Sequence, residues 1–267
     1  MALLRTRRFD LVETALIAVT SAFAGFLAFG AAVPYVASEL TFLKELRPFA
    51  ATYGPERESQ RPEEWLIRNF FQDRRGGFFL DVGANHYRIY SNTYFLEVEL
   101  GWEGIAVEPL IEFEADYATY RPRTRFRPFF VSDISDAQAT LYSVDRDHRI
   151  SSGVADFTGR SGDEVKSRTV PTITLNDLLE AEGIDRIDLL TMDIELWEPK
   201  ALAGFDVKRY RPELVCIEGQ PEVRQDILDY FAASGYVVVG RYLRADIWNL
   251  YFTPQASAGG PVRRNAS

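Results

Sequence analysis

The stretch that decides the fold runs from Phe78 to Pro109 and reads FFLDVGANHYRIYSNTYFLEVELGWEGIAVEP. It begins with an apolar run, turns at Gly83, continues through an amphipathic helical pattern and ends in a second apolar run that closes on Glu108. This order predicts a β-α-β unit with a nucleotide site. Glycine lets the backbone pass close to a ligand, and an acid at the end of the second strand can accept hydrogen bonds from ribose hydroxyls.

The ligand expected at this unit is S-adenosylmethionine (SAM) rather than a dinucleotide. The full G-x-G-x-x-G pattern is absent, so the sequence lacks the glycine-lined helix N-terminus that holds a pyrophosphate. SAM carries no phosphate and does not need such a feature. The spacing from Asp81 to Glu108 is close to the roughly 20 residues expected before a ribose-binding acid.

Apolar runs and helical patterns alternate through the rest of the chain. The expected strands cover 78–83, 104–108, 125–131, 187–193, 213–218, 236–241 and 247–253, and the expected helices cover 62–73, 91–100, 110–120, 175–182, 198–204 and 222–234. Such alternation predicts an α/β, Rossmann-like fold whose mostly parallel sheet has helices on both faces. The last two strands are expected to form an antiparallel hairpin at one edge. Residues 133–172 break the rhythm and predict a long loop over the carboxyl ends of the strands.

Composition limits the classes of function. The chain has 267 residues, of which 46% are hydrophobic, so roughly one domain with appendages is expected. The net charge of -9 argues against a nucleic-acid partner, although four alternating arginines at 121–127 leave a local basic patch open. With one cysteine and two histidines, neither an intramolecular disulfide nor a Cys/His metal cluster can form, and no metal site is expected.

The first 38 residues have the pattern of a membrane anchor. Three arginines precede the stretch 14–38, which contains no charged residue and is longer than the roughly 20 residues that span a bilayer. A cleaved signal peptide is the alternative, because the small residues near Ala37 also fit a cleavage site, but the length favours a retained helix. Residues 39–61 would then form a juxtamembrane connector, 62–254 the α/β domain, and 255–267 a disordered tail.

The flanking charges of such an anchor favour neither membrane orientation clearly. Basic residues flank the apolar stretch on both sides, so the positive-inside rule does not decide between the two topologies. A SAM enzyme needs a cytosolic cofactor. We therefore expect a single-pass membrane protein with its C-terminal domain in the cytoplasm.

The opening stretch resembles the FkbM-type methyltransferases, particularly the branch with an Asn-His pair and Ser-Asn-Thr-Tyr after the first strand. Three further segments agree with the family in collinear order: TITLNDLL at 172–179, IDLLTMDIE at 187–195 and LVCIE at 214–218. The resemblance covers roughly residues 65–254. It implies a Rossmann-like methyltransferase fold and, for most family members, methylation of hydroxyl groups on sugars or small metabolites.

The resemblance also implies roles for individual residues. The cofactor-binding set is Asp81, Gly83 and Asn85 at the methionine part of SAM, Glu108 at the ribose and Asp133 at the adenine edge. Asp193, Glu195 and Glu218 would gather near the transferred methyl group. Because Asp193 and Glu195 alternate, their side chains would point to opposite faces unless the strand has already ended.

Three candidate residues have a second reading. His86 follows the cofactor turn, and an imidazole is suited to take a proton from a hydroxyl near neutral pH, but it also fits a hydrogen-bonded loop histidine. Asp81 fits a residue that caps the following helix as well as one that contacts the cofactor. Glu108 fits a solvated acid at a strand end as well as a ribose ligand.

Leu196 is the main departure from the family, which usually has glycine at this position. Glycine there would permit a positive φ or a close backbone approach. Two hypotheses follow. The first is an active, membrane-anchored SAM-dependent O-methyltransferase. The second is an inactive methyltransferase-fold subunit of a membrane complex, which small residues at Ala22, Gly25, Ala28 and Ala32 would suit, because they permit close helix packing.

Overall fold

The computed structural model describes residues 44–144 and 151–256. The predicted membrane helix at 14–38 and nearly all of the predicted tail at 255–267 lie outside this range. None of the helices in the described part of the chain has the length and apolar character that a bilayer crossing requires. The chain divides into two units, Met1–Pro48 and Phe49–Ser267, and the second contains everything that follows.

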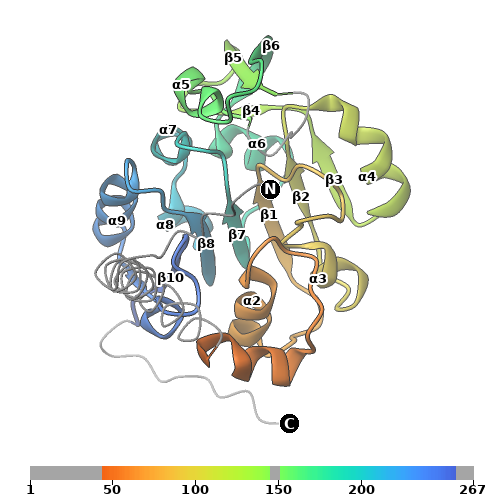
Figure 1. Cartoon of the computed structure of the whole chain (residues 1–267), viewed down its shortest axis with the longest axis vertical. Coiled ribbons are helices and arrows are strands. Elements are labelled where there is room, and N and C mark those ends of the chain that lie inside the picture. The colour runs from red at the N-terminus through yellow and green to blue at the C-terminus, as the bar shows by residue number, and fades with distance from the viewer. Residues whose placement is uncertain (1–43, 145–150, 257–267) are drawn as a thin grey trace, which may run out of the picture. The chain divides into compact units, whose positions relative to one another are not determined.

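A seven-stranded sheet forms the centre of the second unit (Figure 1). Its strands are β1 (Phe78–Val82), β2 (Glu103–Val107), β3 (Thr124–Arg127), β7 (Leu189–Met192), β8 (Leu214–Glu218), β9 (Tyr236–Val238) and β10 (Asn249–Pro254), in the order β3-β2-β1-β7-β8-β10-β9. The pairs from β3 to β8 are parallel, whereas β10 is antiparallel to both β8 and β9. The expected α/β fold, with a mostly parallel sheet and an antiparallel hairpin at one edge, is confirmed.

The strand order reverses between β1 and β7, which is the position where open α/β sheets bind ligands. The connecting helices are α2 (Glu63–Phe71), α3 (Tyr94–Val98), α4 (Glu114–Tyr120), α6 (Leu175–Ala181), α7 (Glu198–Ala203), α8 (Val207–Tyr210) and α9 (Arg224–Ala233). Strands β7 and β8 are buried along their whole length. Near-continuous apolar strands of this kind belong to a sheet that is covered on both faces.

The predicted loop at 133–172 is wrong, and so is the single predicted strand at 125–131. Strand β3 ends at Arg127, and β4 (Phe130–Val131) joins a second sheet with β5 (Gln138–Ser143) and β6 (Lys166–Ile173), in the order β4-β6-β5. A short helix, α5 (Ala155–Gly159), lies between β5 and β6. Most of β6 is exposed. The strand therefore has few buried apolar residues, and their alternation is too short to predict a strand from the sequence.

The arginines at 121–127 do not form an open basic patch. Arg125 and Arg127 both pair with Glu182. Arg121 is fully buried, and its Nε donates to Glu97 Oε2 at 2.5 Å. Carboxylates therefore neutralise three of the four arginines.

A buried network surrounds Arg121. Its Nη2 donates to the hydroxyls of Thr93 and Thr124, each at 3.2 Å, in addition to the bond to Glu97. Thr93 in turn donates to Asp81 Oδ2 at 2.7 Å. We call Asp81, Thr93, Glu97, Arg121 and Thr124 the Arg121 network. It joins the end of β1 to α3 and β3 through side chains whose donors and acceptors are matched.

Candidate cofactor and acceptor site

The turn after β1 is folded tightly against β2 and β7. Gly83 has φ +79°, and a Cβ built on it would lie 1.9 Å from the carbonyl oxygen of Asp193. Its N–H donates to the carbonyl of Val107 at 2.9 Å. The close approach predicted for Gly83 is therefore present, and the partner is the backbone that follows β7. Asn85 has φ +48°, a conformation that asparagine adopts more readily than most residues.

Glu108 lies at the end of β2 and is 5% exposed. Its Oε2 accepts from the N–H of Asn85 at 3.1 Å, and its Oε1 accepts from the N–H of Leu110 at 3.0 Å. A carboxylate offers about four lone-pair directions, so acceptor capacity remains for ribose hydroxyls. Burial raises the pKa of Glu108 to about 7, and the two backbone N–H bonds act in the opposite direction. Glu108 is therefore not a solvated strand-end acid.

A cavity of about 500 Å³, counting its open mouth, lies beside Glu108. Its lining includes Val82, Gly83, Asn85, Glu108, Phe129, Phe130, Val131, Leu141, Ser152, Asp193, Ile194, Glu195 and Trp197. We call it the first cavity. It lies at the carboxyl ends of β1, β2 and β7, where the β-α-β reading expects a ligand.

One wall of the first cavity is apolar and comes largely from the small sheet. The rings of Phe130 and Trp197 meet edge to face, with centroids 5.4 Å apart. Gly153 packs against both, since a Cβ there would lie 2.6 Å from the Trp197 ring. The indole Nε1 of Trp197 has no hydrogen-bond partner among the described residues. The segment predicted as a loop thus does reach the strand ends, as the wall of a cavity.

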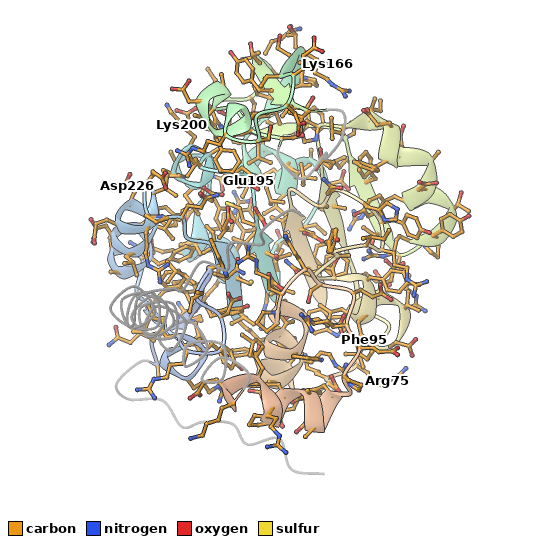
Figure 2. The ribbon with its side chains drawn as sticks, viewed as in Figure 1. Arg75, Phe95, Lys166, Glu195, Lys200 and Asp226 are labelled. Carbon is orange, nitrogen blue, oxygen red and sulfur yellow. The ribbon has the colours of Figure 1, made fainter. Side chains whose placement is uncertain are left out.

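A second cavity adjoins the first. It is lined by Gln60, Gly83, Ala84, Asn85, Tyr90, Asp193 and Glu195. Asp193 and Glu195 therefore border both cavities, together with the glycine turn. Figure 2 shows Glu195 toward the centre of the view, whereas Lys200 of the neighbouring helix α7 lies nearer its outer edge.

Four carboxylates gather at the ends of β7 and β8, and we call them the acidic cluster: Asp193, Glu195, Glu198 and Glu218. One oxygen from each of Asp193, Glu198 and Glu218 lies within 4.8 Å of the other two. The side-chain amide of Gln220 donates to Glu195 Oε2 at 2.7 Å and to Glu218 Oε2 at 3.0 Å. Strand β7 ends at Met192, so the predicted alternation no longer separates Asp193 from Glu195.

Burial and mutual repulsion make every member of the acidic cluster a weaker acid. Burial and the charge of Glu218 raise the pKa of Asp193 well above its usual value, and burial with the charge of Asp193 raises the pKa of Glu195. Burial likewise raises the pKa of Glu218, and that of Glu198 to about 7. Arg61 opposes these effects on Asp193 and Glu218. Each carboxyl group of the acidic cluster therefore binds its proton more tightly than an isolated carboxyl group does.

Leu196 adopts the conformation that its family position favours for glycine. Its φ is +74°, and Glu195 before it has φ +55°. Left-handed backbone costs an L-residue roughly 1–2 kcal/mol, and the rest of the fold must offset this. The Leu196 side chain packs against the main hydrophobic core and lines neither cavity. Leucine was expected to resist a positive φ at this position, and the structure shows that Leu196 adopts one without filling either cavity.

Three predicted site residues, Asp81, His86 and Asp133, line neither cavity. Asp81 is buried and accepts from Thr93, the residue that precedes α3. This geometry agrees with the reading of Asp81 as a support for the helix start. Burial raises the pKa of Asp81 to about 6.

His86 and Asp133 are both engaged in local contacts. The Nδ1 of His86 accepts from the backbone N–H groups of Arg88 and Ile89, at 3.1 and 3.0 Å. This is the loop-histidine geometry, and burial lowers the pKa of its imidazole. Asp133 is exposed and accepts from Lys200 Nζ at 3.0 Å, which lowers its pKa. The segment after β3 instead contributes Phe129, Phe130 and Val131 to the first cavity.

Sequence reasoning missed three residues at the site: Trp197, Glu198 and Gln220. Glu198 comes three residues after Glu195, and Gln220 comes two residues after Glu218. The available signal was the proximity of polar residues to the ends of two apolar runs. Their distances from one another in space depend on the pairing of β7 with β8, which the sequence does not specify.

Comparison with known proteins identifies a family for the chain. A family model described as the methyltransferase FkbM domain matches residues 81–238, more than half of the chain. No curated protein matches the sequence. Among solved structures, a TehB-like SAM-dependent methyltransferase from Corynebacterium glutamicum is 14% identical, with 82% of this chain and 99% of that chain covered and a TM-score of 0.39.

Two O-methyltransferase structures are similarly distant. One, from Thermotoga maritima, is 10% identical over 79% of this chain and 72% of that chain, with a TM-score of 0.40. The other, from Bacillus cereus in complex with SAH, is 13% identical over 79% and 88%, with a TM-score of 0.37. TM-scores this low do not establish a relationship, so the assignment of the chain to a family depends on the family-model match. The chain belongs to the FkbM methyltransferases, and its cofactor is S-adenosylmethionine.

Proposed function

We propose that the chain transfers the methyl group of SAM to a hydroxyl of a small acceptor such as a sugar. The observation that carries this proposal is the pair of adjoining cavities that share Asp193 and Glu195. SAM in the first cavity and an acceptor in the second would meet at these shared residues. Methyl transfer is an in-line displacement, so two sites that meet at one point suit it.

The first cavity offers a distinct environment to each part of SAM. Glu108 retains acceptor capacity for the ribose hydroxyls. The apolar wall at Phe129, Phe130 and Val131 suits the adenine ring, in place of the role first assigned to Asp133. Gly83 and Asn85 border both cavities and suit the methionine part.

Glu195 is the proposed general base. Its carboxylate borders both cavities and is held by the amide of Gln220. As the acceptor oxygen attacks the methyl carbon, the carbon–sulfur bond breaks and its electron pair stays on sulfur, giving neutral S-adenosylhomocysteine. The hydroxyl proton goes to Glu195. Asp193 and Glu218 orient the acceptor, and His86, whose Nδ1 is already bonded, has no part in the proton transfer.

Membrane anchoring by residues 14–38 remains part of the proposal. The support is the uncharged stretch itself, which exceeds the roughly 20 residues needed to span a bilayer. A cytoplasmic C-terminal domain follows from the cytosolic source of SAM. The alternative of an inactive subunit in a membrane complex depended on Leu196, whose side chain packs away from both cavities. That position therefore no longer favours the alternative.

Calorimetric titration of SAM into the full chain tests the cofactor site. Glu108→Ala removes a charge-assisted acceptor worth about 1.5–3 kcal/mol, so the affinity for SAM should fall roughly 10- to 100-fold. Glu103→Ala is the matched control, because Glu103 is exposed at the opposite end of the same strand. The control should bind SAM as the wild type does. No detectable SAM binding by the wild type at millimolar cofactor would refute the proposal.

Turnover measurements then test the proposed base. Glu195→Gln should lower kcat by about 10²- to 10⁴-fold, the usual contribution of a positioned acid or base. Its SAM affinity should stay unchanged, because Glu108 and the apolar wall are intact. A variant with unaltered kcat across a panel of hydroxyl acceptors would exclude Glu195 as the base.

A further inference from the structure

The acidic cluster brings together four carboxyl groups that have no cationic partner in the described part of the chain, since no arginine or lysine there forms an ion pair with any of them. Arg61 acts on the cluster electrostatically, but its guanidinium also lies over the Trp248 ring at 3.9 Å. The amide of Gln220 donates to two of the carboxylates. Buried carboxylates are ordinarily paired or bound to metals.

Glu198 provides a second and independent observation. Its side chain has no solvent-accessible surface. Oε1 accepts from the N–H of Ile194 at 3.1 Å, whereas Oε2 has no hydrogen-bond partner among the described residues. An unsatisfied buried oxygen is costly, and more so when it is charged. An oxygen of the same Glu198 carboxylate lies within 4.8 Å of oxygens of Asp193 and Glu218, so a cation shared by the three groups would stabilise the Glu198 charge.

We infer that Asp193, Glu198 and Glu218 bind one divalent cation of the hard, oxygen-preferring class. Two ligands of one ion can be separated by at most twice the metal–oxygen distance. This limit is roughly 4.6–5.2 Å for Ca²⁺ and about 4.1 Å for Mg²⁺. Three oxygens within 4.8 Å of one another can converge on Ca²⁺ after a small inward movement, and on Mg²⁺ or Mn²⁺ after a larger one.

A cation fits this position better than an organic amine does. An ammonium group on an acceptor needs an open path for its carbon chain, and the Glu198 carboxylate has no accessible surface. A bare ion needs no such path beyond the partly exposed Asp193. Carboxylates of three different segments and no thiolate or imidazole form the ligand set, which suits Mg²⁺, Mn²⁺ or Ca²⁺. The expectation of no metal site considered Cys/His clusters, and Glu198 was not among the acids expected to gather with Asp193 and Glu218.

The cation gives the site a means of activating a hydroxyl, an inference that rests on the proposed function. Asp193 borders both cavities, so an ion on its carboxylate would lie beside the acceptor. A bound cation polarises a hydroxyl oxygen and lowers its pKa. Glu195, which is outside the three-ligand set, can then take the proton from an alcohol that a carboxylate alone deprotonates poorly.

Titration with Mn²⁺, followed by electron paramagnetic resonance of the free ion, tests the site in the full chain. We expect one site in the wild type, and at least tenfold weaker Mn²⁺ binding in Glu198→Gln and in Asp193→Asn. Mg²⁺ and Ca²⁺ should displace the bound Mn²⁺. Glu213→Gln is the matched control, because Glu213 precedes the same strand that Glu218 ends and pairs with Arg74 and Arg186. It should bind Mn²⁺ as the wild type does.

The outcomes separate the cation site from the proposed function, because SAM binding is measured on the same samples. Wild-type protein that binds SAM but no Mn²⁺ at millimolar concentration overturns the cation site and leaves the proposed function standing. If both cluster variants bind Mn²⁺ as tightly as the wild type does, the ion binds elsewhere and the cation site is also overturned. Mn²⁺ binding without SAM binding retains the cation site and refutes the methyltransferase proposal. Asp193→Asn remains informative if Glu198→Gln does not fold, since Asp193 is partly exposed.

Discussion

The Arg121 network is buried and the acidic cluster is buried only at Glu198 and Glu218, and the polar atoms of these two groups are satisfied to different degrees. Arg121 donates to Glu97, to the carbonyl of Tyr87 and to two threonine hydroxyls. In the acidic cluster, the side-chain amide of Gln220 donates to Glu195 and Glu218. The Oε2 atom of Glu198 has no hydrogen-bond partner among the described residues. The first arrangement balances a buried cation with a buried anion, whereas the second places anions next to anions.

This difference separates structural charge from functional charge. A buried ion pair with all its hydrogen bonds made holds segments in register, and removing one partner is strongly destabilising. A group of like charges opposes folding and is retained where chemistry needs it. The Arg121 network therefore holds the end of β1 in place through Asp81, and the acidic cluster is where we propose that a ligand or a proton is bound.

Of the substitutions considered, one that breaks the Arg121 network should cause the largest change in the free energy of unfolding. Arg121→Met leaves Glu97 buried without its counter-ion, and we expect the free energy of unfolding to fall by about 3–5 kcal/mol. Urea unfolding of the full chain in mild detergent, followed by tryptophan fluorescence, measures it. Arg209→Met is the control, because the ion pair of Arg209 with Glu180 is exposed and should contribute little to the free energy of unfolding. A loss no larger than that of the control would mean that the network is not structural.

The acidic cluster should lower the free energy of unfolding when its carboxyl groups ionise, whereas the Arg121 network raises it. The pKa of Glu198 rises from 4.5 to about 7 in the folded chain, so the carboxyl is protonated in both states below pH 4.5 and ionises first in the unfolded state as pH rises. Stability is therefore lost between about pH 4.5 and 7. One pKa unit corresponds to about 1.4 kcal/mol, so the loss from Glu198 is about 3 kcal/mol.

Glu198→Gln removes this loss. Relative to the wild type, the variant should gain about 3 kcal/mol in free energy of unfolding when the pH is raised from 4.5 to 8. The measurement is urea unfolding at both pH values with a chelator present, so that bound cations do not contribute. Glu213→Gln serves again as the control and should follow the wild-type pH dependence. A parallel pH dependence of wild type and Glu198→Gln would contradict the assigned pKa shift.

Backbone strain beside the acidic cluster should give a smaller effect. At an ordinary position glycine is less stable than alanine by roughly 0.5–1 kcal/mol. At Leu196, with φ +74°, Leu196→Gly should instead be more stable than Leu196→Ala by about 1 kcal/mol, because only glycine lacks the Cβ clash. Comparing these two variants cancels the loss of the leucine side chain. If Leu196→Ala proves the more stable of the two, the positive φ is not strained.

The smallest effect is expected at Asp133, which is exposed and paired with Lys200. Surface substitutions change free energies by about 0.5 kcal/mol or less, so Asp133→Asn should bind SAM with an affinity within about twofold of the wild type. Calorimetric titration beside Glu108→Ala gives the contrast between an exposed and a buried acid. A tenfold loss in Asp133→Asn would restore Asp133 as a cofactor ligand.

Much of the fold follows from short-range pattern. The apolar runs that became β1, β2, β7 and β8 are buried on both faces, so nearly every residue in them is apolar and their places in the sequence are plain. The small sheet escaped prediction because its strands are largely exposed and have few apolar residues to mark a period. Glycine at position 83 also followed from local sequence, since its turn tolerates no side chain.

The sequence by itself determined the strand and helix order, the nucleotide-type turn, the acid at the end of β2 and the family. The resemblance implied that Asp193, Glu195 and Glu218 gather, and only the tertiary structure shows that Glu198 and Gln220 join them. Strand pairing brings Glu218 to Asp193, and the turn into α7 brings Glu198 to both. The same packing turns Asp133 outward to Lys200 and Leu196 inward to the core. Composition and periodicity report whether a residue is buried, whereas its partners depend on contacts between segments far apart in the chain.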